Sequence, residues 1–377
     1  MSQRRMTSLE LRSTITSAGQ LRLSLDEVDV GECGPEEIVV RVEAAPLNPS
    51  DLGLLLGPAD LTTLKVIGSD KNPTLVAQIP QDRLRMLEAR FDQSLPIGNE
   101  GAGTVVAAGA NGHALIGKKV AMRGGAMYTQ YRRLFERDCI VLPSEVTSAQ
   151  GASMFVNPLT ALAMVETMRR EGHKGLVHTA AASNLGQMLN RICLADGVSL
   201  VNIVRSPAQA IILRNIGARY IVDSTSPDFR SELTEALAAT GATLAFDAVG
   251  GGRLANRILH AMEAAISRTS TGYSRYGSAV LKQVYVYGGL DPSPTELDRG
   301  FGMAWSVGGF LLPNFLQSIG VEATLKLRER VVRELTTTFA SHYTATISLH
   351  EALRPKVVLA YAKKSTGEKY LIDPSRP

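Results

Sequence analysis

The chain has 377 residues, of which 45% are hydrophobic and 20% charged, and its formal net charge is +4. This length exceeds what one hydrophobic core commonly holds, so two domains are expected, and the composition excludes a disordered or fibrous protein. The basic residues are scattered along the chain, which argues against a nucleic-acid-binding or membrane-binding surface.

The three cysteines, Cys33, Cys139 and Cys193, lie far apart and lack CxxC spacing. This pattern argues against a disulfide framework and a thiolate metal site, and it is typical of a reducing compartment. Residues 1–13 contain basic side chains but no apolar signal-peptide core, and no run reaches the roughly 18 apolar residues of a membrane span. We therefore expect a cytoplasmic protein.

The first part of the chain is predicted to form antiparallel strands. Residues 8–43 alternate between apolar and polar side chains and are interrupted by glycines. A short helix is expected from about Ser50, after an irregular segment that contains two prolines. We interpret residues 57–96, which carry several prolines and one short helical pattern, as an insertion. Further strands are expected within 96–112 and 118–135.

From about Pro143 onward, helices alternate with short apolar strands, and the domain boundary is expected there. Six strands are predicted, within 176–181, 199–206, 218–224, 242–250, 283–290 and 303–312. Such alternation is typical of a doubly wound parallel α/β sheet, in which ligands bind beyond the carboxyl ends of the strands. A helix is predicted over about 320–341, and the remaining tail is expected to return to the first domain.

Residues 177–205 predict a strand, a tight turn, a helix and a second strand. Ser183 or Asn184 is expected to cap the helix, whose N-terminus at the end of a buried strand suits a pyrophosphate. Of the glycines in the pattern G-x-G-x-x-G only Gly186 is present, because Ala181 and Ser183 occupy the other two positions. On this motif alone, an ordinary turn of another α/β protein is an equal alternative.

Several short motifs follow one another along almost the whole chain. They are NPSD at 48–51, GNEGAG at 98–103, GAMYTQY at 125–131, NPLTA at 157–161, AAASNLG at 180–186, FDAVGG at 246–251, GGFLL at 308–312 and GEKYLI at 367–372. In this order the motifs resemble the medium-chain dehydrogenase/reductase superfamily and its zinc-free quinone oxidoreductase and enoyl-thioester reductase branch. The resemblance implies a GroES-like β domain over 1–145 and 343–377, with a Rossmann dinucleotide-binding domain inserted over 146–342.

Zinc-containing members of that superfamily carry a histidine in a GHE motif and a cluster of four cysteines. This chain has Asn99 at the histidine position, no cysteine cluster and six isolated histidines, so no metal site is expected. The implied chemistry is direct hydride transfer from a nicotinamide cofactor to a small electron-poor acceptor. In such a reaction the protein supplies binding, orientation and electrostatics.

The resemblance also implies which residues bind the cofactor. Asn48 and Thr160 would lie near the nicotinamide, and Lys369 would reach the phosphates. The remaining candidates are Ser183, Asn184 and Leu185 at the turn, Val249, Gly250, Gly288 and Gly289 along the ribose, and Gly309, Phe310 and Leu311 at the carboxamide. Turn chemistry beside Pro49 explains Asn48 and Asp51 nearly as well, and a hydroxyl bonded to its own helix would explain Thr160.

Asn48, Asp51 and Tyr128 are the candidate catalytic residues. Enoyl-thioester reductases of this branch use a tyrosine after the NPSD motif, whereas this chain has leucines at 54–56 and no tyrosine before Tyr128. If these leucines line the pocket mouth, they favour flat apolar acceptors such as quinones. An enoyl-thioester or α,β-unsaturated carbonyl reductase and a non-catalytic NADPH-binding protein are the alternatives.

Cofactor choice is predicted from the end of the second strand of the 177–205 unit. An NAD site has an acidic residue about 20 residues after the glycine turn, and its carboxylate would repel a 2′-phosphate. This chain has Arg205 and Ser206 there, with Ser224 as a further candidate, so NADPH is expected. An exposed arginine without a ligand is the alternative reading.

The last strand of the parallel sheet is expected to be an exposed and apolar edge. Such an edge is a template for pairing, so a homodimer is predicted. The only other partner expected is the small-molecule acceptor.

Overall fold

The computed structural model describes residues 6–69, 72–270 and 272–376. The chain divides into two compact units, one comprising Met1–Val156 and Ala340–Pro377 and the other Asn157–Phe339. The predicted GroES-like domain (1–145 and 343–377) and Rossmann domain (146–342) are defined by function, and their limits stay predictions.

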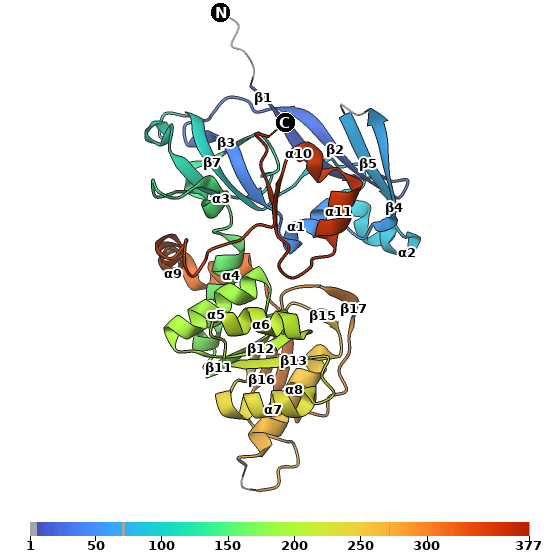
Figure 1. Cartoon of the computed structure of the whole chain (residues 1–377), viewed down its shortest axis with the longest axis vertical. Helices are drawn as coiled ribbons and strands as arrows, with labels where there is room; N and C mark the ends of the chain where they lie inside the picture. The colour runs from blue at the N-terminus through green and yellow to red at the C-terminus, as the bar shows by residue number, and fades with distance from the viewer. Residues whose placement is uncertain (1–5, 70–71, 271, 377) are drawn as a thin grey trace, which may run out of the picture. The chain divides into compact units, whose positions relative to one another are not determined.

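The first unit contains two sheets, shown in Figure 1. The five-stranded sheet has the order β4-β5-β2-β1-β6, with β1 (Thr7–Ile15), β2 (Gln20–Asp29), β4 (Asp60–Ser69), β5 (Asn72–Gln78) and β6 (Leu95–Pro96). The second sheet has the order β10-β8-β7-β3-β20-β19, with β9 paired to β3. Its strands are β3 (Glu37–Pro46), β7 (Glu100–Ala108), β8 (Lys119–Arg123), β9 (Tyr131–Phe135), β10 (Cys139–Val141), β19 (Ala345–Ile347) and β20 (Tyr370–Ile372).

Short helices connect these strands. They are α1 (Pro49–Leu55), α2 (Gln81–Leu84), α3 (Ser148–Gly151), α10 (Leu349–Ala352), α11 (Pro355–Ala362) and the 3₁₀ turns η1 (Arg85–Arg90), η2 (His113–Leu115) and η3 (Glu136–Asp138). The C-terminal tail returns to this unit as predicted, because β20 pairs antiparallel with β3.

The alternating pattern of the first strands has the expected cause. Leu11 and Ile15 of β1 face Leu25 and Leu21 of β2 in the antiparallel register, and these side chains are buried in one apolar cluster. Burying each such side chain contributes about 1.5–3 kcal/mol, so the period of two is fixed by the core beneath it.

That residues 57–96 are an insertion stays a prediction, but they form strands that were not predicted. They contain the two antiparallel strands β4 and β5, and β5 pairs with β2. The helical pattern near 81–91 forms only the four-residue α2 and the 3₁₀ turn η1. Most of β4 is exposed, so its sequence carries no alternation between a buried and a solvated face that could have revealed it.

The second unit contains six parallel strands in the order β13-β12-β11-β14-β16-β18. They are β11 (Gly175–His178), β12 (Ser199–Val204), β13 (Tyr220–Asp223), β14 (Leu244–Asp247), β16 (Lys282–Val286) and β18 (Trp305–Gly309). The central strands are mostly apolar and largely buried, because helices cover both faces of the sheet. This is the predicted Rossmann arrangement, so the fold class is a GroES-like β domain joined to a doubly wound α/β domain.

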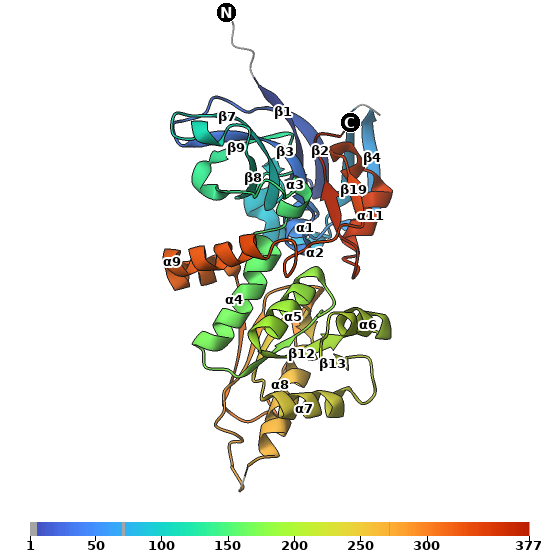
Figure 2. The same ribbon diagram turned by 60° about the vertical axis from the view of Figure 1, so that its left-hand side comes forward.

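The helices of this unit are α4 (Val156–Arg170), α5 (Asn184–Asp196), α6 (Pro207–Asn215), α7 (Phe229–Thr240), α8 (Leu254–Ser267) and α9 (Leu312–Arg333). A small parallel pair, β15 (Gly250–Gly252) and β17 (Asp291–Thr295), completes it. Figures 1 and 2 show α5 and α6 on one side of the parallel sheet and α7 and α8 on the other.

One helix boundary differs from the prediction. The helix expected over about 320–341 begins earlier, at Leu312, and ends at Arg333. The start was misplaced because a glycine in a sequence is typical of a helix boundary, and Gly320 lies within α9. In the structure Gly320 has a non-helical φ of 83°.

Candidate functional site

The turn between β11 and α5 is held by one cap and one close contact. Ser183 is the N-cap of α5, as predicted, and its Oγ accepts a hydrogen bond from Gly186 N at 3.2 Å. A Cβ on Gly186 would lie 2.1 Å from the carbonyl oxygen of Ala181, so only glycine fits there. The first N–H groups of a helix have no acceptor within the helix, and this rigid turn directs them beyond the strand end.

Backbone strain marks the same turn. Ala180 has a φ of 50°, the left-handed region that residues with a Cβ rarely adopt. Such strain persists only where the surroundings enforce it, and it is common at ligand-binding turns. The tight turn therefore forms without the first two glycines of the pattern G-x-G-x-x-G.

The end of β14 is tied to the end of β11 by Asp247, a residue that the sequence prediction missed. Its Oδ1 accepts hydrogen bonds from the Thr179 hydroxyl at 2.7 Å and from Val249 N at 2.9 Å, and its Oδ2 accepts one from Gly250 N at 3.1 Å. The strand order reverses between β12-β11 and β14-β16, which makes this edge the switch point where open α/β sheets bind ligands. The carboxylate fixes the backbone of 247–250 there.

His178, the last residue of β11, is also fixed at this edge. Its Nε2 lies 2.7 Å from the Tyr287 hydroxyl, and its Nδ1 is buried with no hydrogen-bond partner in the described part of the chain. Burial lowers the pKa of His178 to about 3, so the imidazole is neutral at pH 7. A neutral, fully buried ring serves as a structural support rather than as an acid or base.

The glycines predicted along the ribose differ in what surrounds them. A Cβ on Gly250 would lie 2.7 Å from the Gly288 carbonyl oxygen, and a Cβ on Gly288 would lie 2.6 Å from the Ala248 carbonyl oxygen. The close approach of these two backbone segments is enough to require both glycines. A Cβ on Gly289 would meet no atom within 4 Å, so its backbone faces open space. Their predicted role at the ribose stays a prediction.

Arg205 and Ser206 follow β12 directly. Arg205 is exposed and its backbone N donates to Gln209 Oε1 at 3.0 Å, while the Ser206 hydroxyl caps α6 by accepting from Gln209 N at 3.3 Å. Ser224 N donates to Val204 O at 2.8 Å, which holds Ser224 beside Arg205 at the ends of adjacent strands. The structure thus brings together the three residues predicted to select the cofactor, whose role as ligands is untested.

Of the residues predicted near the nicotinamide, Asn48 lies in the first unit, whereas Thr160 and Gly309, Phe310 and Leu311 lie in the second unit. Thr160 is buried within α4. Gly309 ends β18 and would have no atom within 4 Å of a Cβ, Phe310 N donates to Val286 O at 2.9 Å, and Leu311 is exposed. Their contacts with a cofactor stay predictions.

In the first unit, the three candidate catalytic residues contact one another. Asp51 Oδ2 accepts hydrogen bonds from Asn48 N at 2.7 Å and from the Tyr128 hydroxyl at 2.9 Å, and its Oδ1 accepts one from Asn99 N at 3.0 Å. Asn48, Asp51 and Tyr128 are all buried, and Asn48 Oδ1 has no hydrogen-bond partner among the described residues. Burial outweighs the three hydrogen bonds and raises the pKa of Asp51 to about 7.

Glu100 extends this network and was missed in the sequence. Its Oε1 accepts from Asn48 Nδ2 at 2.8 Å, and its Oε2 accepts from the backbone N of both Phe155 and Val156 at 2.8 Å. Burial raises the pKa of Glu100. Its neighbour Asn99, at the position of the zinc-binding histidine, donates from Nδ2 to Ser50 Oγ at 3.1 Å.

Lys369, predicted to reach the cofactor phosphates, is buried in the first unit. Its Nζ donates to Ser153 Oγ at 2.8 Å, and the Ser153 hydroxyl lies 2.8 Å from the Tyr343 hydroxyl. Burial lowers the pKa of Lys369 to about 8, while the nearby charge of Glu100 opposes that shift. A contact between Lys369 and a phosphate stays a prediction.

The leucines at 54–56 were expected at a pocket mouth. Leu55 and Leu56 are instead buried in the apolar core of the first unit, so for these two the expectation was wrong. Leu54 is partly buried and packs against that core, and its place at a pocket mouth stays a prediction.

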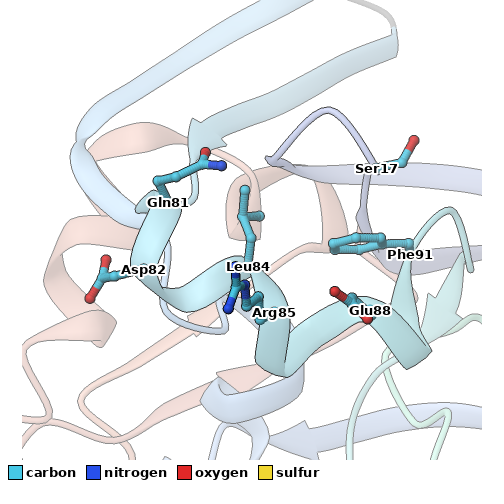
Figure 3. A pocket seen from close by; sticks show the side chains of 7 residues that line it. All are labelled: Ser17, Gln81, Asp82, Leu84, Arg85, Glu88 and Phe91. Atoms are coloured by element: carbon cyan, nitrogen blue, oxygen red, sulfur yellow. The ribbon is translucent and has the colours of Figure 1, made fainter.

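The side chains drawn in Figure 3 line an open hollow in the first unit. Its volume is about 670 Å³. Its lining comes from the turn after β1 and from α2 and η1, and comprises Ser17, Gln81, Asp82, Leu84, Arg85, Glu88 and Phe91. No predicted site residue lies among them.

Within the described residues, no three side chains of His, Cys, Asp or Glu gather as ligands for a metal ion. A search of the same residues found no helix with the length and apolar character needed to cross a membrane.

Several known proteins are similar to this chain in sequence, in fold or in both. No protein-family model matches it. A mitochondrial enoyl-acyl-carrier-protein reductase of Bos taurus is 26% identical over 243 residues, which cover 61% of this chain and 56% of that protein. A quinone oxidoreductase of Pseudomonas aeruginosa is 27% identical over 158 residues, which cover 41% of this chain and 49% of that protein. The chain spans about half the length of these curated relatives.

Solved structures match over nearly the whole chain. One from Mesorhizobium loti, described as an NADPH:quinone reductase, has a TM-score of 0.73 and 25% identity and covers 99% of this chain and 100% of its own. An enoyl thioester reductase from Candida tropicalis, with a TM-score of 0.66 and 19% identity over 98% of this chain and 100% of its own, shares the fold. In sequence and fold, the chain is therefore similar to the quinone reductases and enoyl reductases of the medium-chain dehydrogenase/reductase superfamily.

Proposed function

We propose that this protein is an oxidoreductase that transfers hydride from NADPH to a quinone or a similar electron-poor acceptor. The observation that carries the proposal is the helix N-terminus at the switch point of the parallel sheet, capped by Ser183, with Arg205 where NAD enzymes carry an acid. The quinone reductases among the relatives support the acceptor class.

The donors at the sheet edge fit the chemistry of NADPH. The first turn of α5, with Ser183, Asn184 and Leu185, would bind the pyrophosphate, as helix N-termini do in dinucleotide folds. Arg205, Ser206 and Ser224 would face the 2′-phosphate, because an arginine and hydroxyl donors match its oxygens. The open backbone at Gly289 and Gly309 leaves room for close approach. When bound, NADPH supplies the hydride.

We propose that the buried network of Asn48, Asp51, Glu100 and Tyr128 supplies the proton of the reaction through Asp51 and that its other members hold Asp51 in position. Reduction of a quinone to a hydroquinone consumes one hydride and one proton. Asp51, with a pKa of about 7, can gain and lose a proton at neutral pH. Because Tyr128 is fully buried and bonded to Asp51, we assign it the role of holding Asp51 rather than of touching the acceptor.

Catalysis without zinc is part of the proposal. Asn99 replaces the zinc-binding histidine and its side chain is engaged with Ser50. An amide is also a poor ligand for zinc beside thiolate and imidazole.

A second candidate is an enoyl-thioester reductase. It is favoured by the similarity to mitochondrial enoyl reductases. Against it stand two observations: the loop after the NPSD motif contains no tyrosine, and Tyr128, the first tyrosine of the chain, is buried. A protein that binds NADPH without catalysis is the third candidate.

The test is a panel of quinones, enones and a crotonyl thioester offered with NADPH to the full-length protein, with NADPH absorbance as the readout. The proposal predicts the fastest turnover with a quinone. Faster turnover of the crotonyl thioester than of every quinone would establish the second candidate. Tight NADPH binding without oxidation by any acceptor would establish the third.

A further inference from the structure

A second arginine reaches the end of β13. Arg257, on α8, places its guanidinium 4.0 Å from the centre of the Phe229 ring, and its Nη1 donates to the Ser224 carbonyl oxygen at 3.4 Å. Ser224 in turn is hydrogen-bonded to Val204, the residue before Arg205. The two arginines therefore lie at the ends of adjacent parallel strands, although they are far apart in the sequence.

Neither arginine has an ion-pair partner among the described residues. Two other arginines at the ends of α8 do: Arg253 Nη2 lies 2.8 Å from Asp298 Oδ2, and Arg268 Nη1 lies 2.8 Å from Glu235 Oε1. Partial burial lowers the pKa of Arg257 without any carboxylate to offset it. Two positive charges at one edge that no carboxylate offsets repel each other.

The carboxylate of Asp223, the last residue of β13, already accepts hydrogen bonds from Thr225. Asp223 Oδ1 accepts hydrogen bonds from Thr225 N at 2.9 Å and from the Thr225 hydroxyl at 2.8 Å. These bonds keep Asp223 in its own turn. The Ser224 carbonyl occupies only one guanidinium nitrogen of Arg257, and a phosphate can take two N–H donors from one face of the group.

We propose that Arg257 is a second determinant of cofactor choice, which contacts the 2′-phosphate of NADPH together with Arg205. This inference rests on the proposed use of NADPH. The Phe229 ring holds the guanidinium in place, so little side-chain freedom is lost when the phosphate binds. The ligand class is a phosphomonoester on the ribose of an adenosine nucleotide.

The test separates the 2′-phosphate from the rest of the nucleotide. Calorimetry on the full-length protein compares 2′,5′-ADP with 5′-AMP, which lacks the 2′-phosphate, for the wild type and for Arg257→Ala. We expect Arg257→Ala to weaken 2′,5′-ADP about tenfold to a hundredfold and to leave 5′-AMP within a factor of about two. Arg257→Lys should recover part of the loss, because it keeps the charge but not the two-pronged geometry.

Arg268→Ala is the matched control, because Arg268 lies at the other end of α8 and is paired with Glu235. It should bind both nucleotides as the wild type does. Equal weakening of both nucleotides by Arg257→Ala would make Arg257 an adenosine contact and overturn the inference, as would unchanged affinity for both. A wild type that binds the two nucleotides equally would instead contradict the proposed NADPH preference itself.

Discussion

Asp51 is the residue whose protonation couples the buried network to folding. Its pKa of about 7 in the folded chain lies above the value of about 3.9 expected when unfolded, so the folded state binds more protons between these values. The contribution of Asp51 to the free energy of unfolding should therefore fall as pH rises from 4 to 7, by at most about 1.4 kcal/mol per pH unit.

Urea denaturation at several pH values in this window measures the effect. Asp51→Asn should remove this contribution from the slope, because the amide cannot release a proton. Glu100 shifts in the same direction, and His178, with its pKa lowered to about 3, acts in the opposite direction; both remain in both proteins. Lys369, with a pKa of about 8, acts above this window. The same slope in wild type and variant would show that Asp51 titrates normally.

At the scale of single residues, the predicted preference for NADPH depends on Arg205. Arg205→Asp should raise the Michaelis constant for NADPH by about tenfold to a hundredfold, because it replaces a charge-assisted hydrogen bond with repulsion. The constant for NADH should stay the same or improve. Steady-state kinetics with both cofactors provide the measurement, and equal loss for both would remove Arg205 as the selector.

Part of the site was predictable from residue types and part was not. Asn48 and Asp51 stand in one short motif, so their contact follows from a helix start. Tyr128 joins them only through the fold. Glu100 and Asp247 stand in the motifs GNEGAG and FDAVGG, but the contacts that give them a role include partners far away in the sequence, Asn48 and Thr179. Arg257 escaped prediction because its partner Ser224 is also distant in the sequence.

At the scale of elements, the turn before α5 offers a direct test of the dinucleotide site. Gly186→Ala would place a Cβ against the Ala181 carbonyl oxygen, so the start of α5 must shift. We expect lower stability and at least tenfold weaker binding of NADPH, measured by denaturation and calorimetry. Gly53→Ala in α1 is the control, because a Cβ there meets no atom within 4 Å. Unchanged NADPH affinity in Gly186→Ala would separate this turn from the cofactor.

The elements themselves followed from the sequence where packing imposes a clear period. The unit β11-α5-β12 was predicted because its strands are buried on both faces and its helix has an apolar stripe. The strands β4 and β5 were not predicted, because β4 has no buried face. The start of α9 was misjudged for a related reason: only Thr324 and Val331 are buried in it, so its period is faint.

At the scale of the whole molecule, the exposed end of the parallel sheet supports the proposed homodimer. β18 is an edge strand, and the exposed apolar residues Leu311, Val321 and Leu325 follow it in the chain. An edge with such a surface is a pairing template unless it is covered.

Val321 is 78% exposed, so Val321→Asp should cost the folded monomer little while breaking the dimer. Light scattering at micromolar concentration should give a dimer for the wild type and a monomer for this variant. Val66→Asp, at an exposed position of β4 in the first unit, is the control that should remain dimeric. A monomeric wild type would contradict the prediction.

The central claim is direct hydride transfer from NADPH without a metal. The most direct measurement is quinone reduction by chelator-treated protein, with NADPH carrying either hydrogen or deuterium at the transferred position. The account predicts that the treated protein keeps its full rate and that deuterium slows it, because the carbon–hydrogen bond breaks in the transfer step. A rate that is lost with the metal and restored by zinc, or the absence of NADPH oxidation with every acceptor, would contradict it.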